Sequence, residues 1–237
     1  MQSTSTENNP NFSDIDYIKS HPLGEIFCYC DEVGRGPLAG PVVSCSVYLF
    51  PEGAGEQISY LKNINVTDSK KLNQKKRLTI LELMNIDVKT LKENKLYKIN
   101  DLMGFALSSC NEKEIDEINI LQASLLSMKR ALSIVQRGKS ILEAYALLDG
   151  NKTFKKSGFK GIEALVKGDS KSVFIALSSI IAKEYRDFQM CEFAKIYPEY
   201  GFESHSGYPT KYHKEAIINC GVLNIHRKSF KGVREYC

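Results

Sequence analysis

The chain has 237 residues, of which 43% are hydrophobic and 25% charged, and its formal net charge is +4. This length and composition are typical of one soluble globular domain with one substantial core. The sequence contains no apolar run near the roughly 20 residues that span a bilayer, so we expect a cytoplasmic protein without a membrane contact. The small positive charge is compatible with a polyanionic partner and does not require one.

Residues 1–23 are rich in Ser, Thr and Asn and have neither a basic start nor an apolar segment. We therefore predict a flexible tail without a targeting signal, followed by one folded domain over residues 24–237. The seven cysteines include no C-x-x-C pair, and we interpret them as reduced thiols.

Taken in chain order, the patterns predict alternating strands and helices. Residues 25–30 and 42–50 are dominated by β-branched and aromatic residues, which favour strands. The Pro- and Gly-containing residues 51–57 predict a loop, Asn73 is placed to cap a helix, and Asn111 with Glu114 resembles a capping box. Further strands are expected within 96–109, 144–149 and 162–166, and further helices over 173–197 and 212–220. The alternation predicts an α/β domain with a mixed sheet.

Four acidic residues follow apolar, strand-like runs directly or after one or two residues: Asp31, Glu32, Asp149 and Asp169. If the strands of Asp31 and Asp149 are neighbours, their carboxylates lie close together and repel unless a cation neutralises them. Oxygen ligands without His or Cys favour Mg²⁺ or Mn²⁺, and two such ions can hydrolyse a phosphodiester. A simpler alternative stays open, in which Asp169 caps the following helix and Asp149-Gly150 forms a turn.

A Gly-Arg-Gly sequence follows the first acidic pair. Gly34 and Gly36 flank Arg35, so the backbone here can approach a ligand closely. The segment matches neither a Walker loop nor a dinucleotide-binding fingerprint. By itself it is also compatible with a tight turn that carries a solvated arginine.

Several longer motifs occur in a characteristic order: DEVGRGPLAGPVV, TDSKKL, LLDGN, VKGDSKS, SSIIAKEYRD, HSGYPTKYH and HRKSF. This order, over about residues 24–230, resembles ribonuclease HII, the type 2 ribonuclease H. The resemblance implies a ribonuclease H-like fold with a mixed five-stranded sheet flanked by helices. It also implies an endonuclease that hydrolyses RNA in RNA–DNA hybrids and cuts 5′ to single ribonucleotides embedded in duplex DNA. The products would carry 3′-hydroxyl and 5′-phosphate ends.

The resemblance assigns roles to particular residues. Asp31, Glu32, Asp149 and Asp169 would be the catalytic metal ligands, with Mg²⁺ or Mn²⁺ and two ions in the catalytic complex. The backbone of Gly34, Arg35 and Gly36 would read the ribose 2′-hydroxyl, the group that distinguishes RNA from DNA. Tyr208 would stack on the sugar 3′ of the ribonucleotide. Tyr29 and Pro209 depart from the residues usual in the family.

Other polar residues have simpler interpretations. Lys70 belongs to a basic cluster with Lys71, Lys75, Lys76 and Arg77, which is either a solvated helix face or, for Lys70, a phosphate contact. Asp187 is placed to pair with Lys183. The spacing of His205, His213, His226 and Cys220 matches no common zinc module, so structural or phosphate-side roles are favoured.

Two other functions stay open: a nuclease of the same fold that acts on DNA alone, and a non-catalytic hybrid-binding protein. The Gly-Arg-Gly segment argues against the first and the four carboxylates against the second. We expect a monomer. No clamp-binding motif is visible in the C-terminal residues, so recruitment by a sliding clamp through such a tail is not expected.

Overall fold

The computed structural model of the protein describes residues 11–22, 26–139, 144–155 and 158–237. Within these ranges six strands form one sheet in the order β3-β4-β2-β1-β5-β6. The strands are β1 (Ile26–Val33), β2 (Val42–Leu49), β3 (Leu96–Lys98), β4 (Met103–Cys110), β5 (Ala144–Asp149) and β6 (Gly161–Leu165). The first four in the sheet pair antiparallel, whereas β5 runs parallel to β1 and β6 parallel to β5. The sheet is mixed, as predicted, but it has six strands instead of five, and its edge strand β3 is only three residues long.

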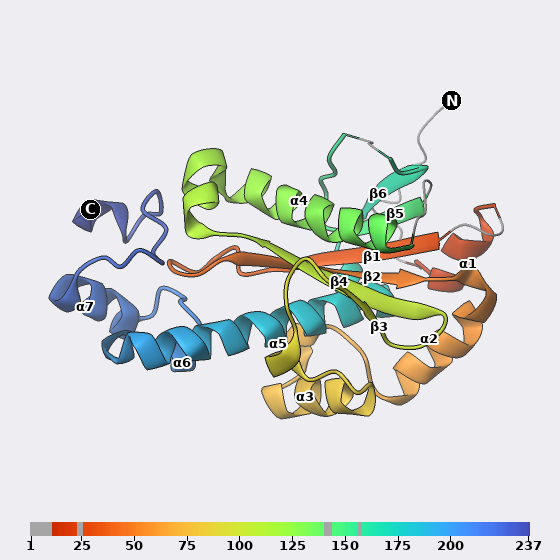
Figure 1. The fold of residues 1–237 in the computed structure, drawn as a ribbon, viewed down its shortest axis with the longest axis horizontal. Coiled ribbons are helices and arrows are strands. Elements are labelled where there is room, and N and C mark those ends of the chain that lie inside the picture. Colours follow the sequence, from red (N-terminus) through yellow and green to blue (C-terminus); the bar gives the residue numbers. More distant parts are fainter. Residues whose placement is uncertain (1–10, 23–25, 140–143, 156–157) are drawn as a thin grey trace.

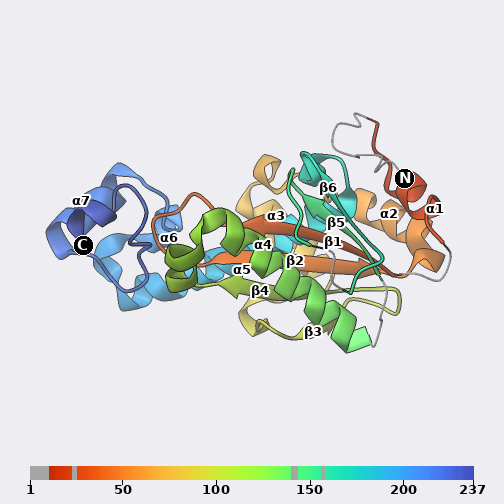
Figure 2. The same cartoon turned by 90° about the horizontal axis from the view of Figure 1, so that it is seen from above.

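Helices cover both faces of the sheet, with α4 on one face and α5 on the other (Figure 1). The N-terminal helix α1 and the C-terminal helix α7 lie at opposite ends of the molecule (Figure 2). The helices are α1 (Asp14–Lys19), α2 (Ala54–Asn63), α3 (Gln74–Leu83), α4 (Glu112–Lys139), α5 (Val173–Ile196), α6 (Phe202–His205) and α7 (Lys211–Cys220). Short 3₁₀ helices include η3 (Ser69–Lys71), which precedes α3, and η5 (Gly168–Ser170), which precedes α5.

Strand β1 alternates its side chains between the two layers, as a strand must. Cys28 and Cys30 lie in the core cluster beneath α4, whereas Tyr29 lies in the cluster beneath α5. The Tyr29 ring packs on Phe174 with the ring centroids 4.8 Å apart, so the sheet accommodates this large residue. All seven cysteines are free in the structure.

Local signals located several helix starts. The Asn73 side chain accepts from the backbone N–H of Lys76 and begins α3. Asn111 and Glu114 exchange side chain–backbone hydrogen bonds of 3.0 Å at the start of α4, which confirms the capping box.

Two predictions differ from the structure. Residues 51–57, expected to be a loop, include the start of α2, because burial of Ala54 and Leu61 stabilises a helix despite the neighbouring glycines. Residues 14–19, expected within a flexible tail, form α1, whose Asp14, Tyr17 and Ile18 are buried. Residues 1–10, and the domain start expected near Gly24, lie outside the described residues.

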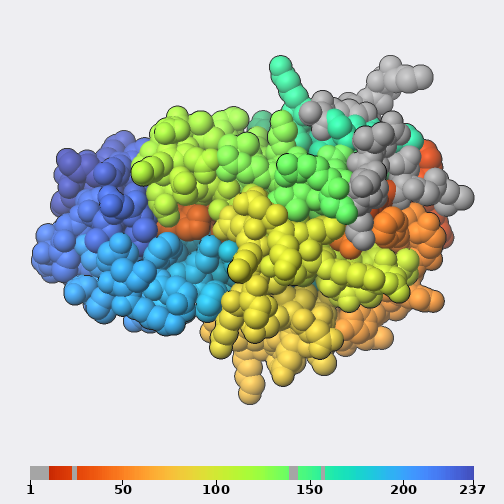
Figure 3. Space-filling view, viewed as in Figure 1, coloured from red at the N-terminus to blue at the C-terminus, as the bar shows by residue number. Residues whose placement is uncertain are grey.

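The C-terminal residues pack around the loop that joins β1 to β2. Leu38 and Ala39 of this loop belong to a cluster with residues of α5, α6 and α7. An isolated bridge pairs Ala39 with His226. In Figure 3 the β1–β2 region (orange-red) reaches the surface between the C-terminal segment (blue) and α4 (green). The fold thus brings residues near 35 and residues beyond 200 to one place.

Candidate active site

The ends of β1 and β5 bring two of the predicted acids together. These strands are parallel neighbours, and Cys30 pairs with Leu148 in their register. Asp31 and Asp149, the next residue on each strand, therefore follow side by side at the same edge of the sheet. This confirms the neighbouring strands that the sequence-based argument required, and Glu32 extends the acidic group along β1.

Asp169 comes to the same edge through η5, which follows β6. The backbone N–H of Gly168 donates a 2.6 Å hydrogen bond to Asp149 Oδ1, so η5 is held directly against the end of β5. One alternative interpretation of the sequence made Asp169 the cap of α5, but Asp169 does not have this position. Ser172 has that position, and its hydroxyl accepts from the N–H of Ile175.

Asp31, Glu32 and Asp149 are largely buried, and burial raises the pKa of each carboxyl group. Burial, with the nearby charges of Asp149 and Glu32, raises the pKa of Asp31 well above its ordinary value. Burial raises the pKa of Glu32 to about 7, against the opposing effect of Arg35. Burial and the charge of Asp169 raise the pKa of Asp149. Burial is the largest cause of each raised pKa, and the neighbouring carboxylates add to it, because both disfavour the charged form.

Two basic side chains pair with this cluster, and both lie at its margin. Lys70 Nζ lies 3.0 Å from Asp169 Oδ2, and Arg35 Nη1 lies 3.3 Å from Glu32 Oε1. Both basic side chains are more than half exposed, at 81% and 52%. Glu32 Oε2 is buried and accepts no hydrogen bond in the structure.

This donor set fits a hard divalent cation. Its oxygens are carboxylates, one of them is buried without a partner, and their raised pKa values fall when a cation approaches. Among the described residues, no three acids, cysteines or histidines are already gathered closely around one point. The Asp31 and Asp149 side chains accept instead from the backbone N–H groups of Glu32 and Gly168.

The Gly-Arg-Gly segment has a backbone that requires its first glycine. Gly34 has φ of +95°, and a Cβ built on it would lie 2.3 Å from Arg186 Nε. A Cβ on Gly36 would lie 3.3 Å from Cε1 of Tyr208. The predicted ribose-reading residues and Tyr208, which is 41% exposed, are therefore neighbours in space.

Two buried arginines that sequence reasoning missed hold this loop. Arg227 donates to the carbonyl oxygens of Gly34 (2.6 Å) and Arg35 (3.1 Å), and twice to that of Gly40. Arg186 donates to Pro41 and Ala39 of the same loop, and to Ser206 next to the Tyr208 segment. Both belong to motifs quoted above, SSIIAKEYRD and HRKSF, but nothing local in those motifs marks them as buried.

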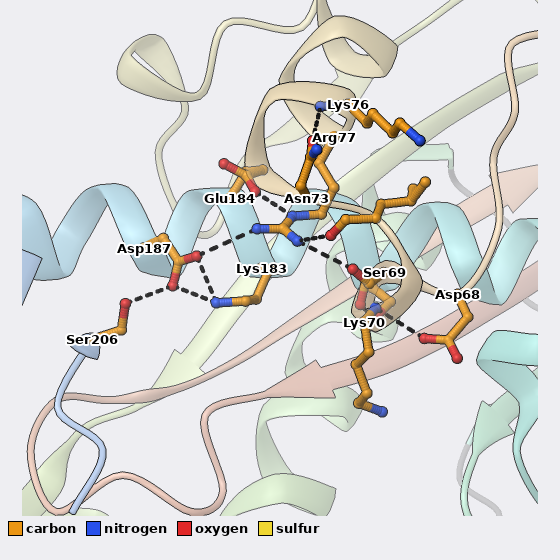
Figure 4. A network of polar contacts seen from close by, with 12 residues as sticks. Asp68, Ser69, Lys70, Asn73, Lys76, Arg77, Lys183, Glu184, Asp187 and Ser206 are labelled. Carbon is orange, nitrogen blue, oxygen red and sulfur yellow. Dashed lines mark hydrogen bonds and ion pairs between the residues drawn. The ribbon is translucent and has the colours of Figure 1, made fainter. Parts of the chain in front are cut away.

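A second network orders the segment that carries Lys70 (Figure 4). Arg77, counted above in the basic cluster, is only 8% exposed and bonds to Glu184 of α5 and to the carbonyl oxygens of Ser69 and Leu72. A solvated helix face is therefore the wrong interpretation for Arg77, which instead fixes η3. The predicted Lys183–Asp187 pair is confirmed at 2.5 Å, and Ser206 Oγ donates to Asp187.

His213 and His226 form a hydrogen-bonded chain, the histidine relay, behind the Tyr208 loop. His213 Nδ1 lies 2.9 Å from the carbonyl oxygen of Tyr208, and His213 Nε2 lies 3.1 Å from His226 Nε2. The backbone N–H of Leu223 donates to His226 Nδ1. His213 and His226 are buried, and burial lowers the pKa of each to about 4. These contacts confirm structural roles for both histidines.

Comparisons with known proteins agree with this geometry. The family described as Ribonuclease HII matches residues 30–233. The chain belongs to the ribonuclease HII family. A ribonuclease HII of Desulfotalea psychrophila is 43% identical over 218 residues, which cover 91% of this chain and 85% of that protein. The family membership shows that the chain is a ribonuclease, a hydrolase of RNA.

Solved structures show the same fold at lower identity. The RNase HII in a PCNA complex from Archaeoglobus fulgidus has a TM-score of 0.62 and 21% identity, covering 87% of this chain and 95% of that one. Bst-RNase HIII in complex with Mn²⁺ has a TM-score of 0.61 and 15% identity, covering 97% of this chain and 74% of that one. The ribonuclease H-like fold predicted from the motifs is thus confirmed. Among the described residues, no helix is both long and apolar enough to cross a membrane.

Proposed function

We propose that this ribonuclease is a Mg²⁺- or Mn²⁺-dependent endonuclease that cuts RNA in RNA–DNA hybrids and 5′ to single ribonucleotides in duplex DNA. The proposal rests on three features of the structure that lie side by side. The acidic edge formed by β1, β5 and η5 adjoins a rigid Gly-Arg-Gly loop, and that loop adjoins an exposed tyrosine. One site can therefore hold a metal at a phosphate and test the ribose beside it.

Asp31, Glu32, Asp149 and Asp169 would hold the metal. When bound, two divalent ions supply an activated water and stabilise the leaving oxygen of the phosphodiester. The Mn²⁺ in the Bst-RNase HIII structure supports a divalent ion in this fold. Buried carboxylates with raised pKa values would lose their protons as the cation binds, because the cation removes the repulsion that raises those values.

The Gly34–Gly36 backbone would recognise the ribose 2′-hydroxyl. Arg227 and Arg186 hold the carbonyl oxygens of this loop, so the loop needs little rearrangement when the substrate arrives. A DNA-only duplex would leave the reading groups unpaired, which is a large penalty at a closed interface. Tyr208, in contact range of Gly36, would stack on the sugar on the 3′ side.

Lys70 has a contact that fits a role in binding a substrate phosphate. Its ammonium reaches Asp169 from an exposed position, which is where a phosphate oxygen of the cleaved strand would approach the metal edge. The relative from Archaeoglobus fulgidus was solved with PCNA, whereas we propose that this chain acts as a monomer.

Cleavage of labelled duplexes tests the proposal. Duplexes with zero, one or four consecutive ribonucleotides are incubated with Mg²⁺, with Mn²⁺ or with chelator. We expect one cut 5′ to the lone ribonucleotide, cuts within the run of four, and no cut in chelator. The upstream product should be extended by a DNA polymerase, because it ends in a 3′-hydroxyl.

The other outcomes are distinct. Cleavage of the duplex without ribonucleotides would identify a nuclease that acts on DNA. Tight binding of the hybrid without any metal-dependent cut would overturn the catalytic assignment.

A further inference from the structure

Helix α1 lies outside the residues that match the family, 30–233, and carries a buried acid. Asp14 is 6% exposed. Its Oδ1 accepts a 2.6 Å hydrogen bond from the Ser172 hydroxyl, and its Oδ2 accepts a 3.0 Å bond from the backbone N–H of Val173. Both partners are about 160 residues away and form the first turn of α5.

These bonds are those of a helix cap supplied from elsewhere in the chain. The first N–H groups of a helix have no partner within it, and a carboxylate there is favoured by the helix dipole. Ser172 already caps α5 by accepting from Ile175, and its hydroxyl hydrogen is then free to donate to Asp14. Asp14 therefore adds a second side-chain acceptor at the N-terminus of α5, for the N–H of Val173.

The capped residues lead directly to the acidic edge. The backbone N–H groups of Lys171 and Ser172 donate to the carbonyl oxygen of Gly168, at 3.0 and 2.8 Å. The N–H of Gly168 donates in turn to Asp149, and Asp169 is the next residue. An unbroken set of hydrogen bonds thus runs from Asp14 through Ser172 and Gly168 to Asp149.

The same N-terminal segment contacts the strands that carry the other acids. Tyr17 packs edge-on against Phe27 of β1, with centroids 6.0 Å apart. His21 packs on Tyr145 of β5 at 4.0 Å, and its Nε2 lies 3.7 Å from Glu163 of β6. Figure 1 shows α1 at this end of the sheet. The segment therefore joins β1, β5, β6 and α5 at their starts.

We propose that Asp14 is a positioning residue for the metal centre, and that α1 acts as a clip that fixes η5 and Asp169 against Asp149 through the first turn of α5. The inference rests on the proposed function, in which Asp149 and Asp169 bind the divalent ion. Asp14 itself touches neither metal nor substrate.

The test compares two alanine variants of the same helix in the full chain. Asp14→Ala removes both bonds to α5, whereas Ile18→Ala removes buried apolar contacts without changing a polar contact to α5. We expect Asp14→Ala to weaken Mn²⁺ binding, measured by calorimetry, by roughly five-fold, the factor that corresponds to loss of one helix cap. The Mn²⁺ concentration for half-maximal cleavage should rise equally, with kcat at saturating Mn²⁺ near that of the wild type. Ile18→Ala should lower Tm without changing either metal value.

A milder variant covers the case in which Asp14→Ala does not fold. Asp14→Asn keeps an oxygen that can accept from one of the two donors, so it should weaken Mn²⁺ binding less than alanine does. Amide hydrogen exchange at Val173 and Gly168 should accelerate in the same order.

Two results would overturn the positioning role of Asp14. One is wild-type Mn²⁺ affinity in folded Asp14→Ala or Asp14→Asn, and the other is an equal loss of affinity in Ile18→Ala. Failure of the underlying function is distinguishable, because in that case Asp149→Asn would leave Mn²⁺ binding unchanged as well.

Discussion

The acidic edge and the β1–β2 loop are neighbours, yet the buried charged groups of the two regions have opposite signs. At the acidic edge, carboxylates of like charge raise one another's pKa, and Glu32 Oε2 is buried without a hydrogen-bond partner. In the loop, two buried guanidinium groups donate to successive carbonyl oxygens. The first region has positive charge only from the exposed Lys70 and Arg35 side chains among the described residues, whereas the second contains two buried guanidinium groups.

Under the proposed function, this difference assigns metal binding to the first region and ribose recognition to the second. Guanidinium groups that bond backbone oxygens make the loop rigid before any substrate arrives, which favours discrimination by shape and hydrogen bonding. The acidic edge carries its acids on the ends of β1 and β5 and on η5, and under the proposed function a cation completes it. We expect mutations in the first region to abolish metal-dependent chemistry and mutations in the second to alter ribose discrimination.

The largest effect should come from neutralising the acidic edge. Asp31→Asn or Asp149→Asn removes a negative oxygen ligand with little change in size, so cleavage of a single-ribonucleotide duplex should fall by about 10³-fold or more. Calorimetry should show weaker Mn²⁺ binding in both variants. Tm should not fall, because each change removes like-charge repulsion at a buried site.

Asp101→Asn is the matched control. Asp101 precedes β4, and the register of β4 with β2 places it at the other end of the sheet from Asp31. Near wild-type turnover by folded Asp31→Asn, equal to that of the control, would remove Asp31 from the metal site.

The second prediction separates the two glycines of the loop. Gly34→Ala places a Cβ 2.3 Å from Arg186 Nε at a backbone with φ of +95°, so the loop and its arginine must shift. Gly36→Ala meets only the Tyr208 ring, at 3.3 Å, and the ring can move by a few tenths of an ångström. We expect Gly34→Ala to lower both Tm and cleavage strongly, whereas Gly36→Ala should lower cleavage by about ten-fold with Tm nearly unchanged.

Metal binding is the internal control for this pair. It should change little in Gly36→Ala, because no acidic residue is touched. The ratio of cleavage at a lone ribonucleotide to cleavage at a 2′-methoxy nucleotide reports on ribose reading. If Gly36→Ala leaves cleavage at the lone ribonucleotide unaltered, ribose recognition lies elsewhere.

The sequence located the acidic edge because its signal is local. An acid that directly follows an apolar strand lies at a sheet edge, and the structure brings Asp31 and Asp149 side by side for this reason. Helix caps at Asn73 and Asn111 were found for the same reason, since both partners lie within three residues. Asp169 reaches the edge, although its expected alternative role as a cap belongs to Ser172.

The sequence did not locate interactions whose partners are distant along the chain. Arg227 bonds to residues 187–193 positions away, and Asp14 to Ser172 and Val173. Phe12, Ile15, Tyr17 and Ile18 surround Asp14, but the Ser-, Thr- and Asn-rich residues before them led to the prediction of a tail. Helix α2 was missed because Pro and Gly near its start carry more weight in a local pattern than the later burial of Leu61.

The smallest predicted effect concerns pH, and it separates the histidine relay from the acidic edge. Burial lowers the pKa of His213 and His226 to about 4, from an ordinary value of about 6.5 in an unfolded chain. The unfolded state therefore binds more protons between these values, so the relay's contribution to stability is complete above pH 6.5 and is lost as pH falls toward 4. Glu32 behaves oppositely, because its pKa is raised to about 7: in chelator, its burial should cost most above pH 7 and least below pH 5.

Urea unfolding at pH 7.5, 6 and 4.5 in chelator measures both trends. His226→Gln removes one of the two titrating rings, so its free energy of unfolding should be lower than that of the wild type at pH 7.5, and the gap should narrow as pH falls to 4.5. Each histidine contributes at most about 3 kcal/mol over this interval, and the two are not additive, because the rings share one hydrogen bond. Glu32→Gln should instead be more stable than the wild type at pH 7.5, with the advantage shrinking at 4.5. A gap between His226→Gln and the wild type that stays constant with pH would show that His226 titrates normally, and the relay would then be no more than packing behind the Tyr208 loop.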